Sequence, residues 1–446
     1  MQAVSYNTFC LKRHQLMMEQ PLPSFFDVVV VGTGLEESIL AAAAARNGHS
    51  VLHVDTNDQY GGEWAAYTFD GIQDWIRRQQ SLSEPEVLDN EEGEEEEHDP
   101  RTLQAKFCEE GEQFMLLKPE RKARDVVQKW HVPENDAVDE AATKVPDDDI
   151  GREAKKADQK FTKDFLSKNS RKFNLDLLPR LLFSRGSMVE LLISSNVSRY
   201  TEFKSVSRVL TLLDGSLVHV PSSRADVFQT RAVSVVEKRI LMKFLTFCHD
   251  LPSMTEEEAG ARIAQFKDRK YREFLKHEKL TDNLVHFVMH SIAMVGEDAT
   301  TQEGLAATAK FLTSLGRFGG ATPFLWSMFG AGELPQAFCR LCAVFGGTYF
   351  LGRKIEGIVV SEDKTCKAII AQGSLRFLNL NICDLHKMTG VPHISGTRIN
   401  CGKLVLPISR SPFDRDVQDE EKYMSRQLIL LSDSVMPSEK EQVGLL

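Results

Sequence analysis

The sequence predicts an α/β protein in two parts: a large domain built on a parallel sheet, and a smaller all-helical domain inserted into it. Three observations carry this prediction. A strand–turn–helix–strand pattern begins at Phe25, helical patterns follow one another through residues 225–315 without a convincing strand, and strand patterns return after residue 317. Sheet-forming blocks that are far apart in the sequence, with helices between them, indicate a helical insertion in a layered α/β domain.

The first element is a β-α-β unit. The run "FFDVVVV" is short and β-branched, as in a strand buried on both faces. "GTG" forms the turn, and "LEESILAAAAARNG" is a strong helix former that ends at Gly48, a suitable C-terminal cap. "SVLHVD" is a second buried strand, so the two strands are expected to lie parallel in one sheet.

The turn of this unit resembles a dinucleotide fingerprint that has lost one position. Gly32 and Gly34 stand where a phosphate-binding turn needs them, but Glu37 replaces the third glycine. A carboxylate in the first helical turn suits the helix dipole, yet it repels a pyrophosphate. Asp55 ends the second strand, where an acidic residue would hold a ribose. These residues favour a disabled nucleotide site, with FAD or NAD binding as the alternative.

Two polar segments flank the first block of the large domain. Residues 1–24 show no periodicity and are expected to be a disordered extension. Residues 81–169 contain the acidic run "EPEVLDNEEGEEEEHDP" and few aromatic residues, which predicts a mobile acidic linker. Only its middle, around "FMLLKPERKARDVVQKWHV", has a composition that suits a little local structure.

The remaining blocks alternate between the two predicted domains. Residues 170–235 continue the large domain and include "RVLTLLDGSLVHVP", which reads as a hairpin with Asp214-Gly215 at its turn. Residues 236–316 form the helical domain, and residues 317–446 return to the large domain. Within that last block, residues 374–397 carry no clear pattern and are interpreted as an atypical insertion.

Composition excludes several classes of function. The net charge of −10 disfavours nucleic acid as a ligand, since phosphate binding relies on a basic surface. Eight scattered cysteines form no disulfide framework, which favours a reducing, cytoplasmic location. No apolar run reaches the ~20 residues that span a bilayer, so we expect only transient membrane contact. His286 and His290, and the pair Cys339 and Cys342, supply too few ligands for a metal site, and none is predicted.

Several longer motifs, in order, carry a family resemblance. The stretch "VVVVGTGLEESILAAAAARNGHSVLHVDTNDQYGGEW" resembles the first block of the Rab escort proteins and the Rab GDP-dissociation inhibitors. "NVSRYTEFKSVSRVL", "PSSRADVF" and "VEKRILMKFLTFC" resemble their central blocks, and "LGRFGGATPFLWSMFGAGELPQAFCRLCAVFGGTYFL" resembles the block that returns the chain to the large domain. The long acidic linker and the sequences of the central blocks resemble the escort proteins more than the dissociation inhibitors.

The resemblance implies a non-catalytic adaptor. Escort proteins bind GDP-bound Rab GTPases, present them to the α/β heterodimer of Rab geranylgeranyltransferase, and deliver the prenylated product to a membrane. Their fold resembles flavoprotein oxidases, an FAD/NAD-binding-like architecture, but they use no flavin, so no cofactor is expected. A dissociation inhibitor that only recycles prenylated Rabs is the main alternative, and an FAD-dependent oxidoreductase is a further one.

The family's Rab-binding motifs can be carried over one residue at a time. Tyrosine and arginine are residue types that anchor interfaces, and a charged glutamate sets register and specificity. No catalytic set is present among them. The implied Rab-binding positions are Tyr60, Arg317, Glu333, Arg340, Thr348 and Phe350.

The helical domain is expected to shield the geranylgeranyl group and to contact the transferase. Burial of each CH₂ contributes about 0.8 kcal/mol, so an apolar groove between helices would bind the isoprenoid strongly. Tyr271 and Phe274 are the predicted exposed aromatic contacts for the transferase. Ordinary helix packing remains the alternative for each lining residue. The candidate lining of the prenyl pocket is Leu241, Phe244, Leu245, Phe247, Val285 and Met289.

The end of the chain departs from the family pattern. Relatives in this family continue well beyond the position of Leu446 and complete the large domain's sheet. We expect the strands that are missing here to leave edges and apolar faces exposed, and to lower stability.

Overall fold

A computed structural model describes residues 23–81, 100–118, 123–131, 162–213, 215–221, 226–227, 233–255, 260, 262–371, 397–413, 424–432 and 444–445. The chain divides into two compact units. Unit 1 comprises Met1–Leu178 and Gly332–Leu428, and unit 2 comprises Pro179–Ala331 and Ile429–Leu446. The predicted extension 1–24, except for its last two residues, and the predicted insertion 374–397, except for Thr397, lie outside the described residues.

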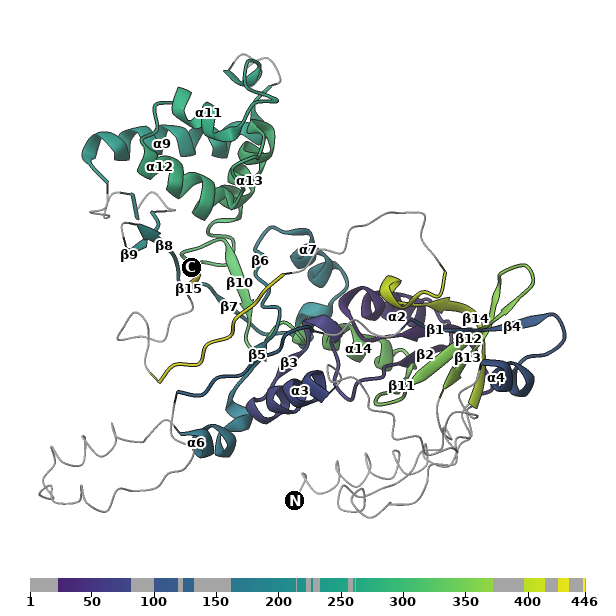
Figure 1. Ribbon diagram of the computed structural model, residues 1–446. Helices are drawn as coiled ribbons and strands as arrows, with labels where there is room; N and C mark the ends of the chain where they lie inside the picture. Colours follow the sequence, from purple (N-terminus) through teal and green to yellow (C-terminus); the bar gives the residue numbers. More distant parts are fainter. Residues whose placement is uncertain are drawn as a thin grey trace, which may run out of the picture. The chain divides into compact units, whose positions relative to one another are not determined.

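Unit 1 is organised around a seven-stranded mixed sheet (Figure 1). The strand order is β11-β2-β1-β14-β13-β12-β4, in which β11, β2, β1 and β14 run parallel and the remaining pairs are antiparallel. β14 therefore joins a parallel half to an antiparallel half. The strands are β1 (Phe25–Val31), β2 (Val51–Val54), β4 (Glu112–Leu116), β11 (Thr348–Phe350), β12 (Ile355–Ser361), β13 (Cys366–Ala371) and β14 (Thr397–Val405).

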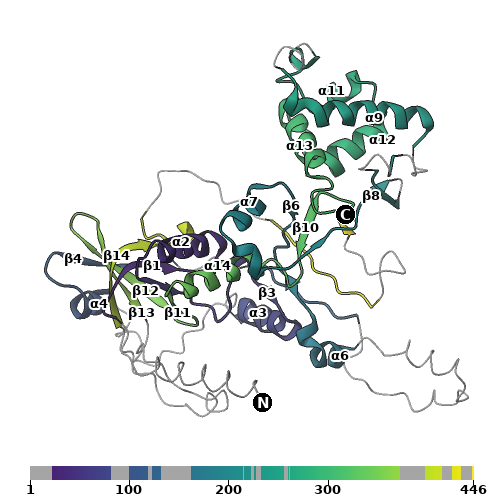
Figure 2. The ribbon, with the colours of Figure 1, turned by 180° about the vertical axis from the view of Figure 1, so that it is seen from behind.

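The predicted β-α-β unit is confirmed at the centre of this sheet. β1 pairs in parallel with β2, with Val28 opposite Val51, and the valines of β1 from Val29 to Val31 are fully buried. This burial on both faces explains why the strand reads as a continuous apolar run. The crossover helix α2 (Leu35–Arg46) packs against α14 (Glu333–Val344), as both ribbon views show (Figures 1 and 2).

Part of the predicted mobile linker, residues 81–169, is an ordered strand, which overlaps the middle stretch expected to hold a little local structure. β4 lies within it and forms the edge of the sheet, pairing antiparallel with β12. The side chain of Gln104, on α4 (Pro100–Phe107), donates to the carbonyl of Glu112 at 2.7 Å, and Arg398 makes two hydrogen bonds of 2.6 and 2.9 Å to the Glu112 carboxylate. The acidic residues around this five-residue strand obscure its short apolar pattern.

Shorter elements complete unit 1. They include one further small sheet, in which β3 pairs antiparallel with β5. One of the helices, α6, also falls inside the predicted linker. These elements are η1 (Gly62–Trp64), β3 (Ala66–Tyr67), α3 (Phe69–Ser81), α6 (Lys163–Lys168), η3 (Ser170–Lys172), β5 (Leu175–Asp176) and η8 (Ile408–Arg410).

Unit 2 contains the helical part and two small sheets. The helices pack around one core cluster that is rich in buried phenylalanine and leucine. Capping boxes, formed by Ser234 with Glu237 and by Thr300 with Glu303, fix the starts of α9 and α13. The helices are α7 (Ser187–Ser194), η4 (Val197–Tyr200), α9 (Val235–Asp250), η5 (Leu251–Ser253), α11 (Tyr271–His277), α12 (Asp282–His286), the π-helical η6 (Phe287–Ala293) and α13 (Thr301–Ser314).

Unit 2 extends beyond residues 236–316, the range predicted for the helical domain, because it also contains strands. β6 (Leu182–Phe183), β10 (Phe324–Ser327) and β7 (Phe203–Ser205) form one antiparallel sheet. β8 (Arg208–Leu213) and β9 (Ser216–His219) form the predicted hairpin, and β15 (Gly444–Leu445) pairs in parallel with β8. Because β10 pairs with β6 and β7, residues 179–235 and 317–331 cluster with the helices rather than with the large domain.

Candidate functional site

Three aromatic side chains gather at the carboxyl ends of β2 and β11. Tyr60 follows β2, and its ring lies edge-on to that of Tyr349, with centroids 5.9 Å apart. The ring centroid of His53 lies 5.0 Å from that of Tyr349, and the Nδ1 of His53 is 3.2 Å from the Tyr349 hydroxyl. The carboxyl edge of a parallel sheet is where such folds bind their ligands. The sequence analysis named Tyr60 but missed Tyr349, which lies between the predicted Thr348 and Phe350.

The turn that carries Tyr60 is fixed by the strand–helix turn beside it. The backbone N–H of Gly61 donates to the carbonyl and to Oγ1 of Thr33, each at 3.1 Å, and Gly61 has φ of 112°. A side chain at this φ would be strained, so the glycine after Tyr60 is required. Asp55, in turn, accepts hydrogen bonds from the Thr33 N–H at 2.7 Å and its hydroxyl at 2.6 Å. The carboxylate expected to hold a ribose therefore braces the turn.

Glu37 folds back over the glycine turn. Its carboxylate lies so close to Gly34 that any side chain there would collide with it, and it accepts from its own backbone N–H. Burial raises the pKa of Glu37, and Glu36, Asp55 and Glu63 raise it further. Gly32, with φ of 91°, remains the residue that permits the tight turn. Negative charge at the helix start is thus supplied by the protein itself, where a pyrophosphate would otherwise lie.

Helix α14 carries Glu333 and Arg340, two further predicted Rab-binding residues in unit 1. Glu333 is in the first turn and half-buried, whereas Arg340 is exposed toward the other end. A side chain at Gly332 would meet the backbone of Trp64–Ala66, and one at Gly347 would collide with Cys342. The first contact packs the start of α14 against the segment Trp64–Ala66, and the second packs the chain after α14 against the end of the helix.

The predicted positions on β11 have different environments. Thr348 is half-buried opposite Leu52, consistent with a surface role. Phe350, also predicted as a Rab-binding position, is only 9% exposed and belongs to the core cluster of the sheet. Phe350 pairs with Val54, and both belong to the same apolar core cluster.

Arg317 belongs to unit 2 and has partners within that unit. Its Nη1 donates to the Ser184 carbonyl at 2.7 Å and forms an ion pair with Glu190. These contacts join the segment before β10 to the start of α7. Arg317 is therefore anchored in its own unit.

The six candidate prenyl-lining residues all lie in one core cluster of unit 2. Leu241, Phe244, Leu245 and Phe247 occupy α9, while Val285 and Met289 occupy α12 and η6, and all are at most 6% exposed. The structure shows them packed together. A groove of about 200 Å³ borders this cluster, lined by Ile240, Lys243, Phe244, His277, Glu278 and Lys279.

The predicted transferase contacts are not on the surface. Tyr271 and Phe274 are both 0% exposed. The Tyr271 ring lies directly against Gly304 of α13, and its hydroxyl lies 2.8 Å from Oγ1 of Thr308. The expectation of exposed aromatic contacts at these two positions is therefore wrong. The helical spacing of Tyr271 and Phe274 marks the buried face of α11, which faces the helical core.

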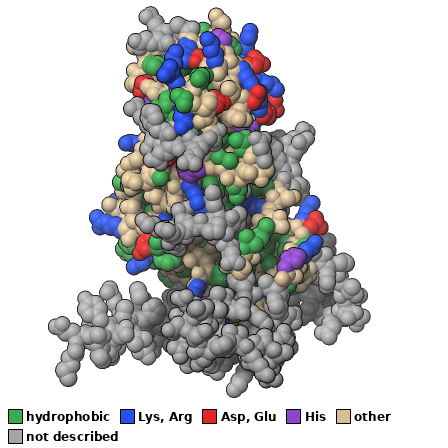
Figure 3. Space-filling model, turned by 90° about the vertical axis from the view of Figure 1, so that its left-hand side faces the viewer, with side chains coloured by type: hydrophobic (Ala, Val, Ile, Leu, Met, Phe, Trp, Pro, Cys, Tyr) green, Lys and Arg blue, Asp and Glu red, His purple; other side chains and the backbone are tan. Residues whose placement is uncertain are grey.

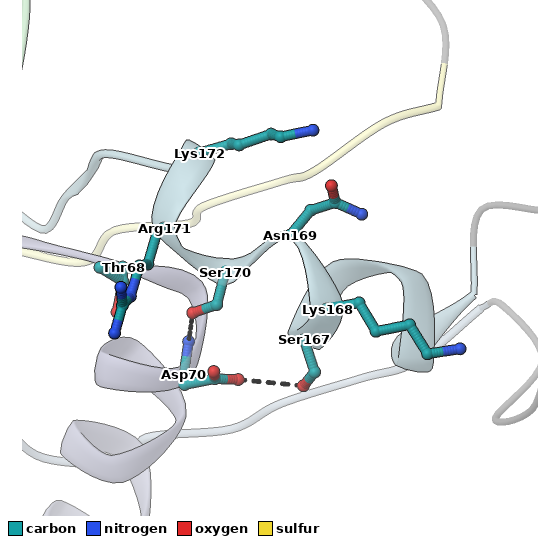
Figure 4. A pocket seen from close by; sticks show the side chains of 8 residues that line it. All are labelled: Thr68, Asp70, Ser167, Lys168, Asn169, Ser170, Arg171 and Lys172. Atoms are coloured by element: carbon teal, nitrogen blue, oxygen red, sulfur yellow. Dashed lines mark hydrogen bonds between the residues drawn. The ribbon is translucent and has the colours of Figure 1, made fainter.

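One pocket of unit 1 is lined by none of these positions. It measures about 380 Å³ and is lined by the start of α3 and the segment from α6 to η3 (Figure 4). The Ser170 hydroxyl accepts from the backbone N–H of Asp70 at 2.8 Å, and the Ser167 hydroxyl donates to the Asp70 carboxylate at 2.9 Å. These hydrogen bonds hold the start of α3 to the segment from α6 to η3. None of the residues that line the pocket is a predicted site residue.

Two further expectations concern ions and membranes. Cys339 and Cys342 are buried, as expected of residues on the core side of α14, and the His286 and His290 rings lie 5.1 Å apart. In the part of the chain that the structure describes, no group of three or more His, Cys, Asp or Glu side chains could hold a metal ion. The helices among the same residues include none that is long and apolar enough to cross a membrane. On the face seen in Figure 3, basic and acidic side chains are interspersed over the helical part.

The comparison with known families decides the lineage. The model of the GDI family, GDP dissociation inhibitor, matches residues 18–99 and 149–435. The chain belongs to the GDP dissociation inhibitor family. Within this family it is 34% identical to mouse Rab proteins geranylgeranyltransferase component A 2, over 95% of this chain and 76% of the relative. It is 38% identical to the human component A 1, over 81% of this chain and 66% of the relative.

Other members of the GDP dissociation inhibitor family are more distant. Rat Rab GDP dissociation inhibitor beta is 26% identical over 80% of this chain and 63% of that protein. The crystal structure of Rab GDI from Plasmodium falciparum shares the fold, with a TM-score of 0.51 and 18% identity, covering 86% of this chain and 66% of that one. The chain thus combines the family's α/β fold with a sequence more similar to component A than to this inhibitor.

Proposed function

We propose that this protein is a Rab escort adaptor, the non-catalytic component A of Rab geranylgeranyltransferase. The observation that carries the proposal is the 34% identity to mouse component A over 95% of the chain. The chain spans 76% of that relative, and 66% of the human one. On this proposal the protein works in the cytosol, meets a membrane only during delivery, and needs no cofactor.

The proposed Rab-binding surface is on unit 1. It consists of the half-buried aromatic Tyr60, the exposed Arg340 and the half-buried Glu333 and Thr348. A partly exposed tyrosine on a rigid backing, here Tyr349, is the kind of group that anchors protein interfaces. Arginine and glutamate near it set the register of a charged partner. Arg317 is left out of this surface, because its described contacts lie within unit 2.

The proposed site for the geranylgeranyl group is the helical core of unit 2. Its candidate lining is already packed, so the isoprenoid would enter by separating helices. The π-helical η6 supplies Met289, whose flexible side chain adapts to an apolar guest. We propose the groove beside Phe244 as the point where this separation begins.

The test is assembly of a ternary complex. The full chain is mixed with the transferase α/β heterodimer and an unprenylated, GDP-loaded Rab, and analysed by size-exclusion chromatography. An escort protein forms the three-part complex, and the GTP-loaded Rab forms less of it. Arg340→Glu is the matched variant, expected to lose the Rab but to retain the transferase.

A dissociation inhibitor gives a different result in the same experiment. It binds prenylated Rab but forms no complex with the transferase and unprenylated Rab. A purified protein with bound flavin would instead support an oxidoreductase, which is the least favoured alternative because Glu37 lies over the glycine turn.

A further inference from the structure

Two cysteines lie side by side in the middle of the unit 1 sheet. The Sγ atoms of Cys366, on β13, and Cys401, on β14, are 3.9 Å apart. The two strands are antiparallel neighbours, with Ala368 opposite Asn400 next to the pair. A disulfide has an S–S distance of about 2 Å, so the two sulfurs must approach each other by about a further 2 Å to form a bond.

The two thiols differ in access. Cys366 is half-buried, while Cys401 is 4% exposed and lies in the sheet's core cluster opposite Phe26 of β1. The two sulfurs share a contact in which either thiol could be the donor. This contact lowers the pKa of Cys366, and the same contact, with burial, raises the pKa of Cys401. The accessible sulfur is thus the one that is more readily a thiolate, the form that attacks disulfides.

We propose that Cys366 and Cys401 form a reversible redox clasp that takes a low-molecular-weight disulfide as its oxidant. The Cys366 thiolate attacks one sulfur of glutathione disulfide, forming a mixed disulfide and releasing one glutathione. Cys401 loses its proton to solvent and attacks the Cys366 sulfur, releasing the second glutathione. Two protein thiols are oxidised to one disulfide, and one glutathione disulfide is reduced to two thiols.

The position of the clasp gives it a consequence. β14 pairs with β1 on one side and β13 on the other, so it joins the parallel half of the sheet, which carries Tyr60, to the antiparallel half. A bond between β13 and β14 closes this junction covalently. In a reducing compartment such a bond is transient, which suits a sensor rather than a structural crosslink. The inference does not depend on the proposed Rab binding.

The experiment treats the folded full chain with glutathione disulfide and maps the products by mass spectrometry. The expected product has lost two hydrogen atoms and yields a peptide pair joined through Cys366 and Cys401. It melts at a higher temperature than the reduced protein, and dithiothreitol reverses both changes. Cys401→Ser, and separately Cys401→Ala, should stop at the mixed disulfide, with one glutathione attached at Cys366 and no rise in melting temperature.

Cys108→Ser is the matched control, since Cys108 is also half-buried but lies in another contact network, and it should leave the clasp intact. Pairing of Cys366 with Cys108 or Cys383 would overturn the proposal. So would a stable mixed disulfide on wild-type Cys366 that Cys401 fails to resolve, or no reaction at Cys366 at all.

Discussion

The ring of Tyr60 stands edge-on against the ring of Tyr349, at an interplanar angle of 67°. Tyr349 is itself held by His53, a fully buried side chain whose Nε2 lies 2.6 Å from the carbonyl of Gly32. A residue of the proposed interface is therefore backed by a chain of contacts that reaches the glycine turn. This backing orders Tyr60 before a partner arrives, which lowers the entropy cost of binding.

The first prediction concerns Tyr60. Tyr60→Ala should weaken binding of GDP-loaded Rab about tenfold or more, which corresponds to about 1.4 kcal/mol, because an anchoring ring is removed from a preformed position. Isothermal titration calorimetry measures the loss. Tyr60→Phe keeps the edge-on ring and should bind within a few-fold of wild type. Equal affinity of the alanine variant and wild type would remove Tyr60 from the interface.

The second prediction concerns pH and Glu37. Burial raises the pKa of this carboxyl in the folded state, so ionising it costs more in the folded protein than in the unfolded chain. Stability should therefore fall as pH rises from the unfolded value of 4.5 through the raised folded value. Glu37→Gln should melt at a higher temperature than wild type at pH 7, with a difference that shrinks toward pH 4.5.

The control for this effect is Glu36→Gln. Glu36 is exposed on the same helical turn and should change the melting temperature little at either pH. If Glu37→Gln destabilises the protein at pH 7, then the bond from its carboxylate to the helix start outweighs the cost of burying the charge.

The third prediction concerns Gly304. A methyl group there would collide with the ring of Tyr271, which is fully buried and cannot move aside. Gly304→Ala should destabilise unit 2 by about 1–3 kcal/mol, despite the better helix propensity of alanine. Gly296→Ala, at a position with open space around it, should be close to neutral. Chemical denaturation compares the two, and similar midpoints would contradict the tight contact.

The fourth prediction concerns Arg262. Its guanidinium pairs with Glu278, whose side chain is 13% exposed, and lies 4.0 Å from the centre of the Phe247 ring. Arg262→Ala should cost about 1–3 kcal/mol, since it leaves a mostly buried carboxylate unpaired and removes a stacked group.

The matched control for Arg262 is Lys276→Ala. Lys276 pairs with Asp282, but the two side chains are 41% and 83% exposed. Exposed pairs contribute about 0–1 kcal/mol, so this variant should unfold close to wild type. An equal loss in both variants would mean that burial does not distinguish the two ion pairs.

Much of unit 1 could be predicted because its signals are local. The β-branched run of β1, the glycine turn and the alanine-rich α2 each determine their own structure. β4 was not predicted as a strand of the sheet, because its five residues have only a weak local signal among acidic neighbours. Its place depends on pairing with β12, which is far along the chain.

The site residues show a similar limit. Residue type and motif identified Tyr60 and Arg340 as surface candidates, and both are partly or fully exposed. Type alone could not show that Tyr271 and Phe274 face inward, since an aromatic residue at helical spacing suits either side. The deciding contact is Gly304, which allows α11 and α13 to approach closely, and this pairing of two helices is not visible within either one.

The place of β14 has a consequence for synthesis on the ribosome. Phe25 at the start of β1 pairs with Asn400, so the first strand to leave the exit tunnel waits for almost the last described strand before one of its edges is covered. Until then β1 presents unpaired N–H and C=O groups and buried-type valines to solvent. Nascent chains of this protein should consequently require chaperone protection until β14 has left the exit tunnel.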